Sequence, residues 1–428
     1  MDLAFAPRLL SPAASGRPGP SGAASPRLRA AAWASARAAD AKLPRRRWRG
    51  AVALRAQQDN VVQHPARPSS AKESPQRRAL AAALLGLACG AGGLGRRRRA
   101  RAAGPGRSGG KVAVITGAST GIGKATALEL ARCGQYGRVF LAGHNEDKTR
   151  AAMADIKQQL GEPSGSEAVA LDFLPLELSS LASVREAAKR FQETGLPLHT
   201  LICNAAVMAL PERRVTEDGY EFQFEVNYLG HFLLVNLLLP QLQAAGSPGD
   251  PARVISVSSS AHFVKSPLAF GDVTDLNLAG PDGDKYAYYP WTAYGQSKLA
   301  QVMFTYELAR RCEQRGLPIA ANVLDPGFVD TELQRNLPQQ APSIVTKFLA
   351  KTPQRGAETP VLLATSDAGR TSGGYWADSK PADSLGRGTS PLPISQDLAV
   401  EGTTSYESRV WGQLWERSAR FVGLTETV

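Results

Sequence analysis

The sequence is poor in the residues that build disulfide frameworks and metal centres. Its 428 residues include only four cysteines, Cys89, Cys133, Cys203 and Cys312, and no two of them form a Cys-x-x-Cys pair. Histidine is equally sparse, at five positions, and none has the spacing of a metal-binding motif. We therefore expect neither structural disulfides nor a bound metal, and we expect a protein that can function in a reducing compartment.

Acidic residues are scarce in the first 110 positions. That segment holds 4 Asp and Glu against 21 Lys and Arg, a balance of +17, whereas the remainder holds 34 against 29, a balance of −5. The net charge of +12 therefore belongs to the N-terminal segment. A nucleic-acid-binding domain carries its basic residues on its folded surface, so no nucleic-acid partner is expected here.

The same segment has few aromatic or β-branched residues to bury, so we expect it to be disordered. Residues 1–60 are rich in Arg, Ser and Ala, which is typical of a plastid transit peptide, although a plain disordered basic tail is an alternative. A transit peptide predicts a chloroplast location, in the stroma or associated with a membrane.

Residues 61–110 are interpreted as a low-complexity linker that contains one apolar stretch. This stretch, residues 79–95, is 17 residues long and mostly Ala and Gly. A membrane-spanning helix needs about 20 strongly apolar residues. The linker is the preferred interpretation, and a weak membrane anchor or a second targeting signal stays open, so membrane association is left undecided.

From Lys111 onward, short apolar runs alternate with helical patterns. Strands are predicted at 111–116, 138–143, 199–206, 252–259 and 319–327, and helices at 124–133, 146–160, 226–243 and 293–312. Strands that are apolar on both faces and separated by helices indicate a parallel sheet covered on both sides. We therefore predict an α/β fold, a single doubly wound Rossmann domain over residues 111–428.

A glycine-rich turn, "TGASTGIG", follows the first predicted strand. Gly117 permits a tight turn, Gly121 lets the backbone approach a pyrophosphate, and Gly123 lets the helix pack close to the strand. The start of the helix supplies N–H groups for the phosphates. The turn therefore predicts a dinucleotide site, with Thr116, Gly117, Ser119, Thr120, Gly121, Ile122 and Gly123 as candidate cofactor-binding residues.

The end of the second predicted strand, "LAGHNEDK", suggests which dinucleotide binds. A carboxylate there would bind both ribose hydroxyls and repel a 2′-phosphate, but Gly143 has no side chain, and His144 and Lys148 could supply charge or hydrogen bonds. We therefore favour NADP(H) over NAD(H). In "ICNAAV", Asn204 and the small Ala205 follow the strand expected under the adenosine half of the cofactor.

Tyr294 and Lys298, in "WTAYGQSKLAQ", form a candidate proton-transfer pair. A tyrosine has a reference pKa of about 10, and an ammonium one helical turn away would lower it toward the working range. Ser259, in "SVSSSAH", could hold a substrate oxygen, although Ser258 and Ser260 flank it. Asn227, in "EVNYLGHF", could fix a water in the proton path.

Together these motifs resemble the short-chain dehydrogenase/reductase family over about residues 111–424. The resemblance implies that Tyr294 is the acid/base, Lys298 also holds the nicotinamide ribose, Ser259 orients the substrate and Asn227 completes the relay. It also implies that Pro326, Gly327 and Thr331 pass over the nicotinamide. Asp325 departs from the family pattern, which often has His or Tyr before Pro-Gly.

Within the family, the sequence is similar to the retinol-dehydrogenase-like branch. A plastid import-associated dehydrogenase belongs to this branch, and light-dependent protochlorophyllide oxidoreductase is a near relative. The preferred hypothesis is an NADPH-dependent oxidoreductase acting on a bulky apolar carbonyl or alcohol. Reduction of a tetrapyrrole in light and a nucleotide-sensing role in a plastid envelope import complex are the alternatives.

Two structural questions follow from the resemblance. Many relatives form pairs through the helix that carries the catalytic tyrosine, so a homodimer is left open. The aromatic residues before that helix could line an apolar substrate site or pack the loop onto the domain: they are Phe263, Phe270, Tyr286, Tyr288, Tyr289 and Trp291.

Overall fold

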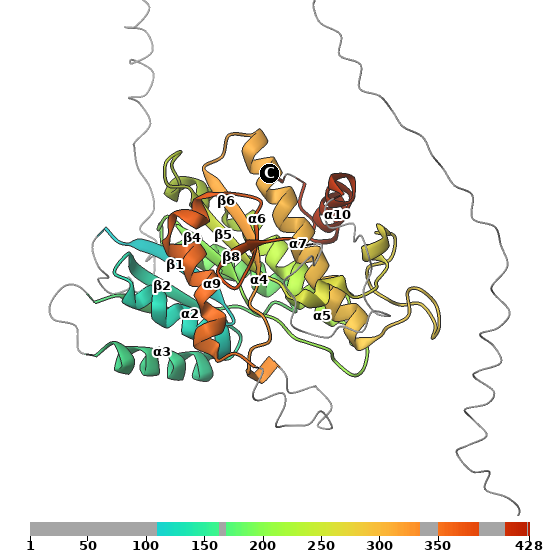
Figure 1. Cartoon of the computed structure of the whole chain (residues 1–428), viewed down its shortest axis with the longest axis horizontal. Helices are drawn as coiled ribbons and strands as arrows, with labels where there is room; N and C mark the ends of the chain where they lie inside the picture. The colour runs from blue at the N-terminus through green and yellow to red at the C-terminus, as the bar shows by residue number, and fades with distance from the viewer. Residues whose placement is uncertain (1–108, 162–167, 334–349, 385–406, 426) are drawn as a thin grey trace, which may run out of the picture. The chain divides into compact units, whose positions relative to one another are not determined.

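The computed structural model describes residues 109–161, 168–333, 350–384, 407–425 and 427–428. An eight-stranded sheet with the order β3-β2-β1-β4-β5-β6-β7-β8 forms its centre (Figure 1). The strands are β1 (Lys111–Thr116), β2 (Tyr136–Gly143), β3 (Ala170–Pro175), β4 (Thr200–Cys203), β5 (Ala252–Val257), β6 (Ile319–Asp325), β7 (Tyr375–Ala377) and β8 (Lys380–Ala382). Every pairing is parallel except β7 with β8.

Helices cover both faces of this sheet. They are α2 (Gly121–Arg132), α3 (Glu146–Leu160), α4 (Leu181–Gln192), α5 (Phe222–Phe224), α6 (Gly230–Ala245), α7 (Pro290–Gln314), α9 (Pro353–Thr365) and α10 (Ser408–Phe421), with short turns η3 (Glu225–Leu229), η4 (Ser260–Phe263), η5 (Leu268–Phe270) and η7 (Asp367–Arg370). None of the helices in the described ranges combines the length and apolar character that crossing a membrane would require.

Alternation along the strands sends side chains into two cores. Val112 and Val114 of β1 join the core under α4, α6, α7 and α10. Ala113 and Ile115 join the core under α2, α3 and α9. Successive strand residues point to opposite faces, so one apolar run fills both layers. The predicted doubly wound α/β fold is confirmed.

Two observed elements have bounds that differ from the predicted ones. The predicted strand at 199–206 ends at Cys203, because the N–H groups of Asn204 and Ala205 bond to the Thr116 hydroxyl instead of a neighbouring strand. The helix predicted at 226–243 begins with the π-helical turn η3 and continues as α6.

The C-terminal helix α10 packs on α7 and α6 (Figure 1). Trp415 lies against Phe232, with ring centres 5.0 Å apart, and stacks on Phe304 at 5.6 Å. The Arg311 guanidinium lies 4.7 Å from the centre of the same indole. The chain's own helix α10 thus covers this face of α7.

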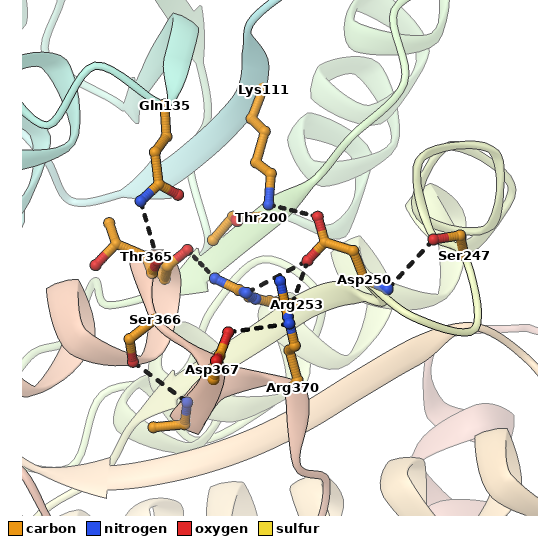
Figure 2. A network of polar contacts seen from close by, with 12 residues as sticks. Lys111, Gln135, Thr200, Ser247, Asp250, Arg253, Thr365, Ser366, Asp367 and Arg370 are labelled. Atoms are coloured by element: carbon orange, nitrogen blue, oxygen red, sulfur yellow. Dashed lines mark hydrogen bonds and ion pairs between the residues drawn. The ribbon is translucent and has the colours of Figure 1, made fainter.

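A polar network ties the amino-terminal edge of the sheet together (Figure 2). Asp250 accepts from Lys111 of β1 at 2.7 Å and lies 3.5 Å from the Arg253 guanidinium of β5 and 3.6 Å from that of Arg370 in η7. Buried Arg253 also donates to the Ala364 carbonyl in α9. These contacts join β1, β5, α9 and η7, so the charged groups at this edge of the sheet have a structural role.

Candidate active site

The turn between β1 and α2 depends on its glycines. Gly117 and Gly121 adopt φ of +65° and +55°, which favour glycine. A Cβ on Gly117 would come within 2.9 Å of the Ala205 Cα, and one on Gly123 within 2.5 Å of the Gly117 carbonyl oxygen. The turn can therefore lie close to β4 and α2 only with glycine at these positions.

The first turn of α2 can bind an anion. Thr120 stands at the N-cap of α2, but its side chain accepts no capping hydrogen bond. By contrast, Asn145 and Ser180 cap α3 and α4 with their side chains. The N–H groups that begin α2, beside Ser119 and Ile122, can therefore bind the pyrophosphate of a dinucleotide, which fits the predicted cofactor.

The hydroxyl of Thr116 has a different task from the one predicted for it. It accepts the backbone N–H groups of Asn204 and Ala205, both at 2.9 Å, and lies 2.9 Å from Nε2 of His231. Nδ1 of His231 is 2.9 Å from the Asn227 carbonyl and must donate to it, so Thr116 donates to Nε2. Thr116 thus joins the glycine turn to β4 and η3 instead of facing the cofactor through its side chain.

The structure selects Ser259 among three consecutive serines. Its hydroxyl lies near the hydroxyl of Tyr294, from α7, and acts to lower the pKa of that phenol. The Ser258 hydroxyl turns away and donates to the Lys298 carbonyl at 3.0 Å. Ser259 caps η4 by accepting the Ala261 N–H at 3.2 Å, and this bond orients it. The predicted serine and tyrosine are therefore neighbours in the fold.

The Asn227 side chain is held between two backbone segments. Its amide nitrogen donates to the Val207 carbonyl and to the Ser297 hydroxyl, both at 2.9 Å, and its oxygen accepts the Val207 N–H at 2.8 Å. Ser297 lies one helical turn after Tyr294 in α7. Sequence reasoning missed Ser297, although its spacing from Tyr294 puts both on one side of the helix.

Lys298 lies beside Tyr294 but is bonded elsewhere. Its ammonium donates to the Val257 carbonyl and to Gln301, both at 2.9 Å, and lies 5.7 Å from the Tyr294 ring centre. Burial lowers the pKa of Lys298 to about 7. Burial also raises the pKa of Tyr294 above its ordinary value, which corrects the expectation that Lys298 lowers it: removal from water decides the direction of the shift, and Ser259 opposes it.

The segment after β6 reaches back to the glycine turn. Gly327 has φ of +77°, and its N–H donates to the carboxylate of buried Asp325 at 2.9 Å. Thr331 lies over Gly121: a Cβ added to Gly121 would be 3.0 Å from the Thr331 methyl group. Pro326, Gly327 and Thr331 therefore stand beside the predicted cofactor site, at the carboxyl ends of the strands.

His144 stands at the outer side of this edge, after β2. Its side chain is exposed, with Nδ1 3.9 Å from a Glu177 oxygen, and Lys148 lies 3.3 Å from Glu332. Both side chains that were expected to bind a 2′-phosphate, His144 and Lys148, therefore already have a carboxylate neighbour. A Cβ on Gly143 would meet only the Thr149 hydroxyl, at 3.5 Å.

Apolar side chains surround Tyr294. Met208, Ala209, Ala261 and Val264 form a buried cluster with it, and Leu333 packs against them. Of the aromatic residues whose role was left open between lining this site and packing the loop, Trp291 lies against Tyr294, with ring centres 6.0 Å apart. The hydroxyls of Tyr286 and Tyr288 bond to protein groups and serve loop packing. The sequence analysis did not name Met208 and Ala209, although "NAAVMAL" continues the apolar run after β4.

Within the described residues, no three His, Cys, Asp or Glu side chains converge as metal ligands would. The predicted site residues instead gather at the carboxyl ends of β1, β4, β5 and β6, with the start of α7 and the turn η3 beside them. Ligands of doubly wound folds bind at this edge.

Comparison with known proteins agrees with this arrangement. A family model described as short chain dehydrogenase matches residues 111–270 and 278–342. Mouse polyprenol dehydrogenase is 42% identical over 281 residues, which cover 65% of this chain and 78% of that protein. Human retinol dehydrogenase 13 is 38% identical over 323 residues, or 74% of this chain and 85% of that protein.

A crystal structure of an uncharacterized protein from Mycobacterium paratuberculosis is also similar. It aligns with a TM-score of 0.51 and 28% identity over 73% of this chain and 93% of that one. The family match, the curated relatives and the observed fold lead to one assignment: the chain belongs to the short chain dehydrogenase family of oxidoreductases, in its retinol-dehydrogenase-like branch.

Proposed function

We propose that the protein interconverts a bulky apolar alcohol and its carbonyl with NADP(H), and that an isoprenoid alcohol is the preferred substrate class. The observation that carries the proposal is the position of Tyr294, which is buried in an apolar cluster at the carboxyl ends of the strands with the Ser259 hydroxyl near its own. Polyprenol and retinol, after which the two relatives are named, are both long isoprenoid alcohols with one terminal hydroxyl.

The residues of this chain handle the substrate oxygen and its proton. Bound NADP(H) supplies or accepts the hydride. In reduction, Ser259 holds the carbonyl oxygen and Tyr294 donates its phenolic proton, which burial keeps in place near neutral pH. In oxidation, Tyr294 must first lose that proton, and a charged Lys298 beside it favours the phenolate. Since Lys298 has a pKa of about 7, its charge responds to the ligand and to pH.

The preference for NADP(H) rests on the end of β2. No carboxylate stands at Gly143, and the exposed His144 follows it at the same strand end. A 2′-phosphate could displace Glu177 and Glu332 as the partner of His144 and Lys148. Initial rates with equal concentrations of NADP⁺ and NAD⁺ test this part of the proposal, which an NAD⁺ preference would contradict.

A plastid location is also proposed, from the composition of residues 1–60 alone, which lie outside the described residues. A fluorescent protein fused to residues 1–60 should enter plastids, and the matched fusion with its arginines changed to glutamate should stay outside. A fusion that stays in the cytosol in both forms would remove this proposal and leave the enzyme proposal unaffected.

The decisive experiment incubates the purified full chain with NADP⁺ and all-trans-retinol or a polyprenol, and in parallel with NADPH and protochlorophyllide in darkness and in light. We expect alcohol oxidation independent of light, lost in Tyr294→Phe with nucleotide binding retained. Product from protochlorophyllide in light alone would replace this proposal with the light-dependent reductase. A Tyr294→Phe chain that fully replaces the wild type in the cell would favour the nucleotide-sensing role.

A further inference from the structure

His262 lies directly behind the candidate catalytic serine and is enclosed on all sides. Its Nδ1 is 2.7 Å from the Ser259 carbonyl oxygen, and its Nε2 is 2.8 Å from the Ser384 carbonyl oxygen. A carbonyl oxygen can only accept, and a neutral imidazole carries one N–H. In the neutral ring, one of these short contacts would therefore set a nitrogen lone pair against an oxygen lone pair.

Asp325 offers the counter-charge that a doubly protonated ring would need. It is 7% exposed, its carboxylate accepts the Gly327 N–H at 2.9 Å, and the nearby Ser260 N–H acts to lower its pKa. Burial lowers the pKa of His262 and raises the pKa of Asp325. The attraction between their opposite charges opposes both of these shifts. When both are ionised, the Ser259 and Ser384 carbonyls each have a donor, and the two opposite charges attract each other inside the protein.

The surroundings contain few other charges. Asp325 interacts electrostatically with Lys298 and Tyr294, both from α7, and with Lys351. Asp325 is also the charged side chain that acts on His262. The faces of the imidazole are covered by aromatic rings, with the Phe263 centre at 3.9 Å and the Tyr375 centre at 5.4 Å. Asp325 is thus the one described residue whose charge opposes desolvation of the ring.

We propose that His262 and Asp325 form a buried charge pair that positions Ser259 and shields Tyr294 from the carboxylate. The proposal rests on the proposed function only for its catalytic consequence. Both are positioning residues: His262 holds the Ser259 carbonyl, and Asp325 holds the Gly327 turn. The carboxylate alone would make Tyr294 a weaker acid, and the imidazolium offsets that effect.

The protonation state of the ring can be measured without a substrate. In full-length protein with ¹⁵N-labelled histidine, His262 should show N–H correlations from both ring nitrogens at pH 8, above the ordinary histidine pKa of about 6.5. The chain has five histidines, so His262→Gln identifies the signals. In Asp325→Asn one of the two correlations should disappear. A single N–H at pH 8 in the wild type would overturn the proposal even if no substrate were known.

The catalytic consequence is tested by the pH profile of retinol oxidation. His262→Gln leaves Asp325 unbalanced, so the pH at which kcat is half maximal should rise by about one unit or more. In an Asp325→Asn background, adding His262→Gln should shift nothing, because the ring there is already neutral. His199→Asn is the matched control: it keeps an acceptor for the Val112 N–H at the opposite edge of the sheet.

These outcomes separate positioning from mere structural damage. A His262→Gln enzyme that loses activity with an unmoved profile would show that the ring carries no charge and would overturn the proposal, as would equal shifts in both backgrounds. Should His262→Gln fail to fold, the ring-proton measurement on the wild type and on Asp325→Asn still decides. If retinol is not oxidised at all, the proposed function fails while the charge pair is still tested.

Discussion

The Thr116 hydroxyl is predicted to be a main determinant of both stability and nucleotide binding. It accepts two half-buried N–H groups, from Asn204 and Ala205, and donates to His231. Thr116→Val keeps the shape of the side chain and removes the hydroxyl. Thr116→Ser keeps the hydroxyl and removes a methyl group, so it is the matched control.

The magnitude follows from the groups left without a partner. In Thr116→Val the Ala205 N–H loses its acceptor and Nε2 of buried His231 loses its donor, at about 1–3 kcal/mol each, so the two cost about 2–6 kcal/mol. The Asn204 N–H keeps the Ile202 carbonyl at 3.1 Å. Loss of one methyl group in Thr116→Ser costs about 1 kcal/mol. The free energy of unfolding should therefore rank wild type, Thr116→Ser and then Thr116→Val, with the larger step between the two variants.

Urea unfolding followed by tryptophan fluorescence measures these differences in the full chain. Nucleotide affinity, measured by calorimetry with NADP⁺, should fall at least about tenfold in Thr116→Val, because the glycine turn is no longer fixed to β4. It should change little in Thr116→Ser. Equal stability and affinity of the two variants would show that the hydroxyl does not hold these elements together and would refute the argument.

Three further predictions concern other parts of the molecule. Gly143→Asp, whose Cβ has room in the structure, should reverse the cofactor preference toward NAD⁺ in a kcat/KM comparison, whereas Gly143→Asn should do so far less. Trp415→Ala should lower the free energy of unfolding by about 3–5 kcal/mol in urea titrations, since the indole fills the space between α10, α6 and α7. An unchanged midpoint would mean that α10 is not firmly docked. Burial and the nearby Asp218 raise the pKa of Glu225 to about 8, so the folded state holds a proton that the unfolded chain releases near pH 4.5. The melting temperature should therefore fall as pH rises from about 5 to about 8, with a smaller slope in Glu225→Gln, and an equal slope in that variant would contradict the assignment.

Much of the framework could be predicted from local pattern. The strand at 111–116 and the helix at 146–160 have the bounds that the sequence predicted, because periods of 2 and 3.6 residues are local signals. Short stretches of sequence also indicate the positive φ of Gly117 and Gly121 and the one-turn spacing of Tyr294 and Lys298. Elements with weaker patterns, such as α9 and α10, were not predicted.

What only the tertiary structure decided depends on residues far apart in the chain. The Thr116 hydroxyl turns inward because His231 and the backbone of Asn204 lie there, and the Tyr294 pKa rises because distant segments bury it. The two carbonyls around His262 come from positions 259 and 384. The sequence by itself determined the fold class and named the candidate site residues. Their charges and partners were decided by the fold, because desolvation and hydrogen bonding depend on three-dimensional neighbours that no local pattern records.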